Sequence, residues 1–178
     1  MSPFSGIPGH AVRCGMLTLR LASGFALRHN RPMMQIDTII GIDASPAVVW
    51  GVLTDFAAYP SWNPFIVNIE GIAGAGERLT IRVVPHGQKG MAFRPRVLVA
   101  DPERQLRWRG RLILPGLFDG EHIFRIEPVA AGVRFHHSER FTGLLPHMMP
   151  ASSFDAVRKG FEAMNEALKQ RAEARKKH

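Results

Sequence analysis

Apolar and polar positions alternate along much of this chain with two periods, one of two residues and one of three to four. The first clear period of two covers residues 35–42, where Ile36, Ile40 and Ile42 share one parity with Thr38. β-branched residues at alternate positions are typical of a strand with one buried face. The pattern therefore predicts a β-strand at the start of the folded region.

A helical period follows directly. The strand pattern stops at 43–46, where Ser45 can cap a helix and Pro46 suits its first position, which needs no N–H donor. A second short helix or turn is expected over 57–62, before the Asn63-Pro64 breaker. The apolar stripe of the first helix consists of Val48, Val49, Val52, Leu53 and Phe56.

Six further segments have strand character and are separated by short glycine- and proline-containing turns. Short separators favour antiparallel hairpins, because parallel neighbours need long crossover connections. The predicted strands are 65–71, 78–84, 93–100, 105–112, 120–127 and 133–142.

The last element is a long amphipathic helix that begins at about residue 153. Beyond Leu168 its apolar stripe fails and charges alternate, so we expect the helix to project into water or fray there. The stripe itself recurs at spacings of three and four and consists of Phe154, Val157, Phe161, Met164 and Leu168.

This order of elements predicts an α+β fold. One strand, two short helices, six strands and one long helix can form a curved antiparallel sheet of seven strands with the helix on its concave side. A single helix cannot fill that concavity, so the remaining space is either packed core or a ligand pocket.

Parity within the strands separates an inner from an outer face. In 105–112, Trp108 shares a parity with Leu106, whereas Arg107, Arg109 and Arg111 take the other and must face water. The remaining residues expected to face inward are Leu79, Ile81, Val83, Phe93, Val97, Val99, His122, Phe124, Ile126, Val133, Phe135, His137, Glu139 and Phe141.

Three of these inward positions are polar. His122, His137 and Glu139 would occupy a mainly apolar lining, where an ionisable group is costly without a partner. Such a set can act as general acid or base, or it can orient a polar group of a ligand. A purely structural hydrogen-bonded pair is the alternative.

Two apolar loops are predicted to leave the sheet at the same end. They are the turn at 114–118 and the connection at 143–149. Apolar loops gathered at one rim indicate an entrance lid, a membrane-touching edge or a dimer contact, and methionine suits a lid because it repacks around varied shapes. Their apolar residues are Leu114, Leu117, Phe118, Leu144, Leu145, Met148 and Met149.

Several sequence motifs resemble one known family. The stretches 44–50 (ASPAVVW), 53–56 (LTDF) and 59–65 (YPSWNPF) resemble the polyketide cyclase/dehydrase-like branch of the SRPBCC (START-like) superfamily. The later stretches 101–102 (DP), 106–108 (LRW), 116–122 (GLFDGEH) and 138–141 (SERF) resemble the same branch, and the likeness covers about 35–171.

The resemblance implies a helix-grip fold around a hydrophobic cavity, in a superfamily that includes lipid and hormone binders and aromatic cyclases. It also implies that the turn containing Trp62 lies near the cavity mouth. Together with strand parity, it gives the expected ligand-binding set: Trp62, Phe65, Ile81, Val83, Phe93, Val97, Trp108, Leu114, Phe118, His122, Phe124, Phe135, His137, Glu139, Phe154 and Val157.

Composition fits one domain with basic ends. The 178 residues are 46% hydrophobic and carry a formal charge of +8, and residues 1–36 contain four arginines but no aspartate, glutamate or lysine. We expect a poorly packed basic extension over 1–32, a folded domain over 33–171 and a basic tail over 172–178. The extension is either a targeting segment or sequence upstream of a true start at Met33 or Met34.

Composition also removes several classes of function. Cys14 is the only cysteine, so no internal disulfide forms, and no apolar run approaches the roughly 20 residues of a membrane helix. We therefore expect a cytoplasmic protein. Zinc-type spacing, a phosphate-binding glycine motif and a nucleophile elbow are absent, so neither metal nor cofactor is expected. Basic and aromatic residues do not interleave, which argues against nucleic-acid binding.

The leading hypothesis is that the domain binds a small, mainly hydrophobic molecule in its interior, for transport or sequestration. One alternative is a polyketide cyclase/dehydratase-like enzyme that uses His122, His137 and Glu139. Another is a non-catalytic module that contacts RNA, membrane or protein through its basic ends or its apolar rim. The sequence predicts neither the ligand nor the oligomeric state.

Overall fold

A computed structural model describes residues 34–111 and 117–176 of the chain. In chain order its elements are β1 (Met34–Ile42), α1 (Pro46–Thr54), the 3₁₀-helix η1 (Phe56–Ser61), β2 (Ile66–Glu70), β3 (Thr80–Val83), β4 (Met91–Phe93), β5 (Arg96–Asp101), β6 (Gln105–Arg111), β7 (Asp119–Val129), β8 (Gly132–Thr142), the 3₁₀-helix η2 (Leu145–Met148) and α2 (Ala151–Lys176). The predicted α+β helix-grip class is confirmed, with a different division of the strands.

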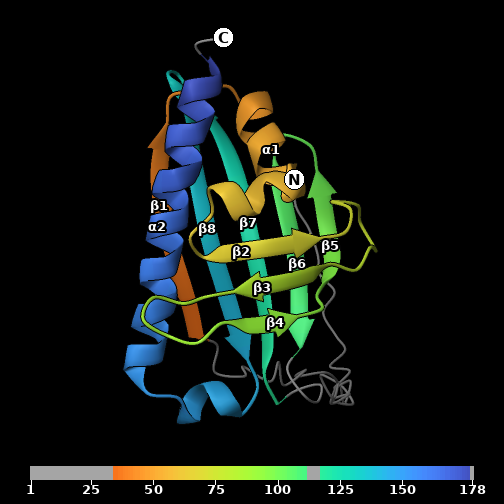
Figure 1. Cartoon of the computed structure of the whole chain (residues 1–178), viewed down its shortest axis with the longest axis vertical. Helices are drawn as coiled ribbons and strands as arrows, with labels where there is room; N and C mark the ends of the chain where they lie inside the picture. The colour runs from red at the N-terminus through yellow and green to blue at the C-terminus, as the bar shows by residue number, and fades with distance from the viewer. Residues whose placement is uncertain (1–33, 112–116, 177–178) are drawn as a thin grey trace, which may run out of the picture.

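A five-stranded antiparallel sheet with the order β1-β8-β7-β6-β5 forms the back of the molecule (Figure 1). Its centre is the β7–β8 hairpin, in which each strand has 11 residues. Gly132 opens β8 at a φ of +107°, and a Cβ there would lie 2.2 Å from the Ile42 carbonyl oxygen. Only glycine permits this close approach of the hairpin to the end of β1.

The remaining strands form a second sheet with the order β2-β3-β4. The sequence predicted one sheet of seven strands, but 93–100 is divided at Arg94-Pro95 into β4 and β5. Proline has no N–H to donate to a continuous ladder, so a break occurs there. Backbone hydrogen bonds nevertheless connect the two sheets beside this break. The Leu79 N–H donates to the Pro95 carbonyl, and the Val97 N–H donates to the Glu77 carbonyl.

A bulge in β5 reverses part of the predicted parity. Val97 pairs with Trp108 and faces inward as expected, but the register shifts before Val99, which pairs with outward-facing Arg107. Ala100 instead packs against the core. The extra residue of a bulge moves every later side chain to the opposite face, so the expected inward position of Val99 is corrected.

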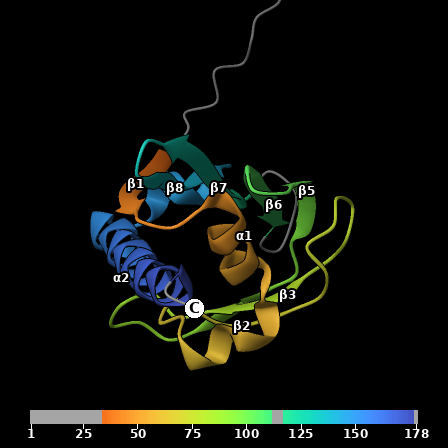
Figure 2. The ribbon, with the colours of Figure 1, turned by 90° about the horizontal axis from the view of Figure 1, so that it is seen from above.

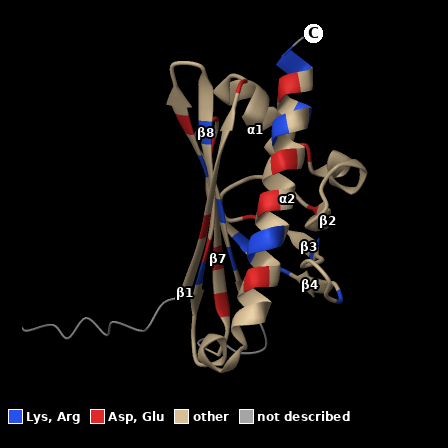
Figure 3. Ribbon diagram, turned by 90° about the vertical axis from the view of Figure 1, so that its left-hand side faces the viewer, with Lys and Arg blue, Asp and Glu red and all other residues tan. Residues whose placement is uncertain are grey.

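The long helix α2 lies across the concave side of the large sheet, and the small sheet closes the space beside it (Figures 2 and 3). Contrary to expectation, α2 neither frays nor projects freely after Leu168. Ala172 is fully buried, and Arg175 and Lys176 form ion pairs with Asp55 and Asp43. The last turns therefore pack beside α1.

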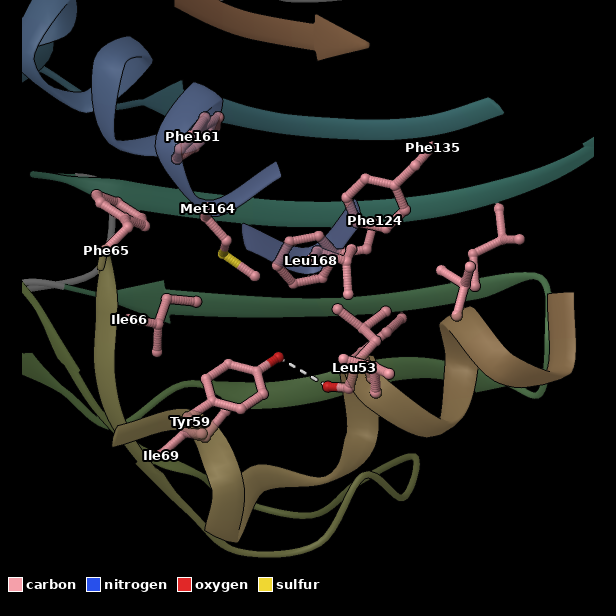
Figure 4. Packing of buried hydrophobic residues seen from close by; sticks show 14 of the residues in the cluster. Leu53, Tyr59, Phe65, Ile66, Ile69, Phe124, Phe135, Phe161, Met164 and Leu168 are labelled. Carbon is pink, nitrogen blue, oxygen red and sulfur yellow. Dashed lines mark hydrogen bonds between the residues drawn. The ribbon is translucent and has the colours of Figure 1, made fainter. Parts of the chain in front are cut away.

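The core lies between α1, α2 and the two sheets (Figure 4). Tyr59 is completely buried, and its hydroxyl donates to the Leu53 carbonyl at 2.7 Å. Burial raises the pKa of Tyr59, so this hydroxyl stays protonated as a donor. None of the described helices has both the length and the hydropathy needed to cross a bilayer.

Candidate ligand-binding site

A cavity of about 320 Å³ lies inside the fold, within the size range of small-molecule sites. Its walls come from the large sheet, the small sheet and the first turns of α2. Ten of the residues expected to bind ligand line this cavity: Phe65, Ile81, Val83, Phe93, Trp108, Phe118, His122, Glu139, Phe154 and Val157.

The apolar rim predicted from hairpin topology forms one end of the cavity. Leu145 N–H donates to the Leu117 carbonyl at 3.0 Å, which brings the two loops together. Leu145, Met148 and Met149 line the cavity, and Met148 is 72% exposed. Leu114, which was also expected here, lies outside the described residues.

Three residues of the expected lining belong to the core instead. Phe124, Phe135 and His137 face inward as their parity predicts, but each is completely buried and none lines the cavity. His137 stacks on Phe161 of α2, with ring centroids 3.7 Å apart. Helix α2 therefore covers this part of the concave face.

Two further residues that were expected to line the cavity, Val97 and Trp62, do not line it. Val97 is buried in the core beside Trp108 and does not reach the cavity. Trp62 packs on the Tyr59 ring at a centroid distance of 4.9 Å, within the turn that follows η1. Trp62 thus stabilises the turn rather than lining the cavity.

The same turn places Phe65 in the cavity wall. Asn63 is buried, and its Oδ1 accepts hydrogen bonds from the N–H groups of Phe65 (3.0 Å) and Ile66 (2.8 Å). These two bonds fix the backbone where β2 begins. The Phe65 ring then meets Phe161 edge-on at 5.3 Å.

A chain of polar side chains runs from the cavity wall through the core. Glu139 Oε2 lies 3.4 Å from His122 Nδ1, and His122 Nε2 lies 2.8 Å from His137 Nε2. His137 Nδ1 lies 2.9 Å from Asn165 Oδ1, and Asn165 Nδ2 donates to Thr38 Oγ1 at 2.9 Å. The three polar residues singled out from strand parity therefore contact one another directly, and partners on α2 and β1 continue the chain beyond His137.

Aromatic neighbours exclude water from the middle of this chain. Trp108 stacks on His122 at a centroid distance of 5.1 Å, and Phe161 stacks on His137. Burial, together with the neighbouring His122, holds the pKa of His137 well below the ordinary histidine value. His137 is therefore neutral, and only the Glu139–His122 end of the chain faces the cavity.

Two residues important to this geometry were missed from sequence. Asn165 is a polar residue on the buried face of α2, one turn after Phe161, and that mismatch with the apolar stripe was a readable signal. Gly120 lines the cavity diagonally across the β7–β8 ladder from Glu139, and a Cβ there would lie 2.7 Å from Glu139 Oε1. No sequence signal distinguishes this glycine from the chain's other glycines.

The site offers an apolar surface with one polar spot. Within residues 34–111 and 117–176, no group of three His, Cys, Asp or Glu side chains is placed to hold a metal ion. The polar spot can exchange or share a proton with a bound molecule, or it can fix that molecule's orientation.

The long helix over a curved antiparallel sheet, with a cavity between them, defines a helix-grip protein. The family model described as "Polyketide cyclase / dehydrase and lipid transport" matches residues 33–173. The chain belongs to this family of the SRPBCC superfamily, as the motif resemblance predicted. A comparison with curated proteins finds no significant relative.

Solved structures show the same fold at low sequence identity. The Zhui aromatase/cyclase from a Streptomyces species has a TM-score of 0.57 at 21% identity, over 80% of this chain and 95% of that one. A protein of unknown function from Staphylococcus aureus gives 0.63 at 13%, over 84% and 99%. A protein from Mesorhizobium loti gives 0.60 at 18%, over 79% and 98%.

Proposed function

We propose that this protein binds a small, mainly hydrophobic molecule in its internal cavity, for transport or sequestration. The observation that carries the proposal is the cavity itself, about 320 Å³ in volume, with the aromatic and aliphatic lining described above. Burying a ligand's apolar surface there would contribute roughly 25 cal/mol per Å² before the cost of immobilisation. Family membership supports the same function, because lipid transport is part of the family's description.

The exposed apolar rim supports a route by which the ligand enters the cavity. Leu144 and Met148 are 64% and 72% exposed on this rim, and Met148 together with half-exposed Met91 of β4 lines the cavity. Methionine side chains adapt to varied shapes without a fixed rotamer. Contact of this rim with a membrane that supplies the ligand remains a prediction.

Binding can be tested with a panel of fatty acids, sterols and fused-ring aromatic compounds. Native mass spectrometry would detect retained compounds, and thermal shift would detect stabilisation, which reaches about 2.7 kcal/mol at a ligand concentration of 100 Kd. We expect at least one compound class to bind with one-to-one stoichiometry. Absence of binding by every class would refute the proposal.

A matched pair of variants locates the binding. Val157→Trp places a large side chain in the cavity wall, whereas Ile39→Trp adds the same ring to an exposed position of β1. We expect the first variant to lose ligand binding while it stays folded, and the second to bind as the wild type does. Equal binding by both variants would place the ligand elsewhere.

A second function is supported by one observation, the Glu139–His122 contact at the cavity wall. A carboxylate beside an imidazole can transfer a proton to or from a bound molecule, as a cyclase or dehydratase requires. Zhui, whose fold is similar, is named an aromatase/cyclase. Under this reading His137 is a positioning residue, because it does not reach the cavity.

Turnover and binding separate the two functions. If the site is catalytic, His122→Gln will abolish conversion of a bound poly-β-ketone while its dissociation constant stays within a few fold. If the site only binds, the wild type will not convert the same poly-β-ketone faster than buffer alone does. Mass spectrometry of the recovered compounds distinguishes these outcomes.

A further inference from the structure

The directions of the hydrogen bonds along the buried chain of polar side chains are fixed at Thr38, the end opposite Glu139. Thr38 Oγ1 donates to the His137 carbonyl oxygen at 3.1 Å, so its hydroxyl hydrogen is committed. Toward Asn165, 2.9 Å away, the same oxygen therefore acts as an acceptor, and the group it faces is the Nδ2 amide nitrogen. The Asn165 amide consequently presents Oδ1 to His137.

That orientation determines which nitrogen of each histidine carries a hydrogen. Asn165 Oδ1 can only accept, so the hydrogen of neutral His137 lies on Nδ1 and its Nε2 is bare. The bare nitrogen accepts from His122 Nε2 at 2.8 Å, which places the His122 hydrogen on Nε2. The low pKa of buried His137 supports this assignment, because a second proton there is disfavoured.

The result at the cavity wall is a pair of acceptors. With its hydrogen on Nε2, neutral His122 presents a bare Nδ1 to Glu139 Oε2 at 3.4 Å. An ionised carboxylate also only accepts, so neither atom supplies a hydrogen to the other. If water supplies a proton that settles between these two atoms, Glu139 Oε1 still remains an acceptor. In both protonation states Glu139 Oε1 is therefore an acceptor that receives no hydrogen from His122.

The other elements around the pair do not provide that donor. Trp108 and Phe161 cover the His122 ring, and the first turns of α2 contribute Phe154 and Val157 to the cavity. Arg111 is the other charged side chain on the described cavity wall, and it lies 3.7 Å from Asp119. Among the described residues, no side chain other than His122 lies in a polar contact with the Glu139 carboxylate.

The position of the carboxylate depends on the absence of a side chain at residue 120. A Cβ at position 120 would lie 2.7 Å from Glu139 Oε1, closer than real Cβ contacts permit. Gly120 and Glu139 both line the cavity from neighbouring strands. The glycine therefore lets Oε1 lie over the sheet, facing the volume that a ligand would fill.

We propose that the cavity selects molecules whose apolar body carries a hydrogen-bond donor, a hydroxyl or an N–H group, placed against Glu139 Oε1. This inference rests on the proposed binding function and adds a chemical class to it. The ligand supplies the hydrogen that the protein side lacks, while Thr38, Asn165 and His137 act as positioning residues. Ethers and esters of the same shape leave the acceptors unsatisfied and bind more weakly.

The test uses two ligands that differ by the donor alone, 2-naphthol and its methyl ether 2-methoxynaphthalene. Calorimetry on the full chain should show that the alcohol binds roughly tenfold more tightly or better. In Glu139→Leu, which fills the same position with an apolar group, the two affinities should become equal within about threefold.

The outcomes separate this inference from the binding function. If both compounds bind the wild type equally, or if Glu139→Leu keeps the preference, the donor rule is overturned while cavity binding stands. If neither compound binds, both proposals fall for this ligand class.

Nitrogen-15 NMR of the histidine rings tests the positioning residues directly. The wild type should show the Nδ1–H tautomer for His137 and the Nε2–H tautomer for His122. Thr38→Val removes the hydroxyl that orients Asn165, so the reversed tautomers should become populated although the variant stays folded. The opposite tautomers in the wild type, or an unchanged spectrum in Thr38→Val, would overturn the assignment.

Discussion

Gly160 of α2 lies directly against the ring of Phe65, and the packing leaves no room for a methyl group. A Cβ at position 160 would lie 2.3 Å from Phe65 Cδ2 and 2.9 Å from Cε2. The backbone N–H of Phe65 donates to Asn63 Oδ1, and its ring forms part of the cavity wall. The distance between α2 and Phe65 at this contact therefore affects the shape of the cavity.

We predict that Gly160→Ala destabilises the fold and narrows the cavity. Overpacking at a buried contact costs about 1–3 kcal/mol, which exceeds the gain of up to about 1 kcal/mol in helix propensity. The Phe65 ring is expected to swing into the cavity, so ligand affinity should fall at least tenfold. Urea unfolding and calorimetry measure the two effects.

Gly51→Ala in α1 is the matched control, because nothing lies within 4 Å of a Cβ at that position. Here only helix propensity changes, so stability should rise by up to about 1 kcal/mol and binding should not change. Gly160→Ala with the stability and affinity of the wild type would show that the helix can move away from Phe65.

A second prediction concerns Gly120 and its partner across the β6–β7 ladder, Gly110. Gly120→Ala pushes the end of the flexible Glu139 side chain aside, so the fold should persist while the preference for 2-naphthol over its methyl ether falls severalfold. Gly110→Ala adds the same methyl group to the cavity wall, but its nearest neighbour lies at an ordinary 3.8 Å. Gly110→Ala should therefore keep the preference, and equal losses in both variants would contradict the role assigned to Gly120.

A third prediction is a loss of stability in mild acid. His137 is neutral in the folded protein because its pKa is lowered, whereas an unfolded histidine takes up a proton below about pH 6.5. The unfolded state then binds more protons, so the free energy of unfolding falls as pH drops below that value. The slope from this one group approaches about 1.4 kcal/mol per pH unit.

Urea unfolding of His137→Gln measures this contribution, because glutamine cannot be charged. The variant should be less stable than the wild type near neutral pH but should depend less steeply on pH between about 6.5 and 5. His147→Gln alters an exposed histidine and should keep the wild-type slope. Identical slopes for the wild type and His137→Gln would show that His137 takes up its proton in the folded state.

The fourth prediction is that the end of α2 stabilises the domain. Removing residues 172–178 deletes buried Ala172, the Glu173 carboxylate that accepts from Asp43 N–H, and the partners of Asp55 and Asp43. The melting temperature should fall by several degrees, mainly through lost packing on α1, since exposed ion pairs contribute little. A chain shortened by residues 177–178 alone should melt as the full chain does. Equal melting of both truncated chains would mean that the final turns are dispensable.

Strand parity predicted much of the buried face, because alternation of side chains is a local property of an extended backbone. Trp108, His122 and His137 all face inward, and Arg107 and Arg109 form ion pairs with Glu121 on the outer face. The prediction failed at Val99, since a bulge depends on how β5 meets β6. The prediction also missed the division of 93–100 into two strands at Pro95, because the alternating pattern of apolar residues continues across the break.

The sequence alone does not predict which of the inward-facing residues line the cavity. Phe124 and Glu139 both have inward parity, yet the first is completely buried in the core and the second lies at the cavity wall. That difference depends on how the helices and the two sheets pack together. The proposed extension over 1–32 lies outside the described residues, and the domain boundary at 171 stays a prediction.

The sequence by itself determined the order of elements, the amphipathic stripe of α2 and the inner face of most strands, since each depends on residues a few positions apart. Tertiary structure alone decided that Asn165 meets His137, that Gly120 makes room for Glu139 and that Gly160 admits Phe65. These contacts join residues 19 to 95 positions apart, and their geometry depends on how the helix and two sheets pack. The cavity is the space left by that packing, so its shape and its unmet hydrogen-bond demand appear only in three dimensions.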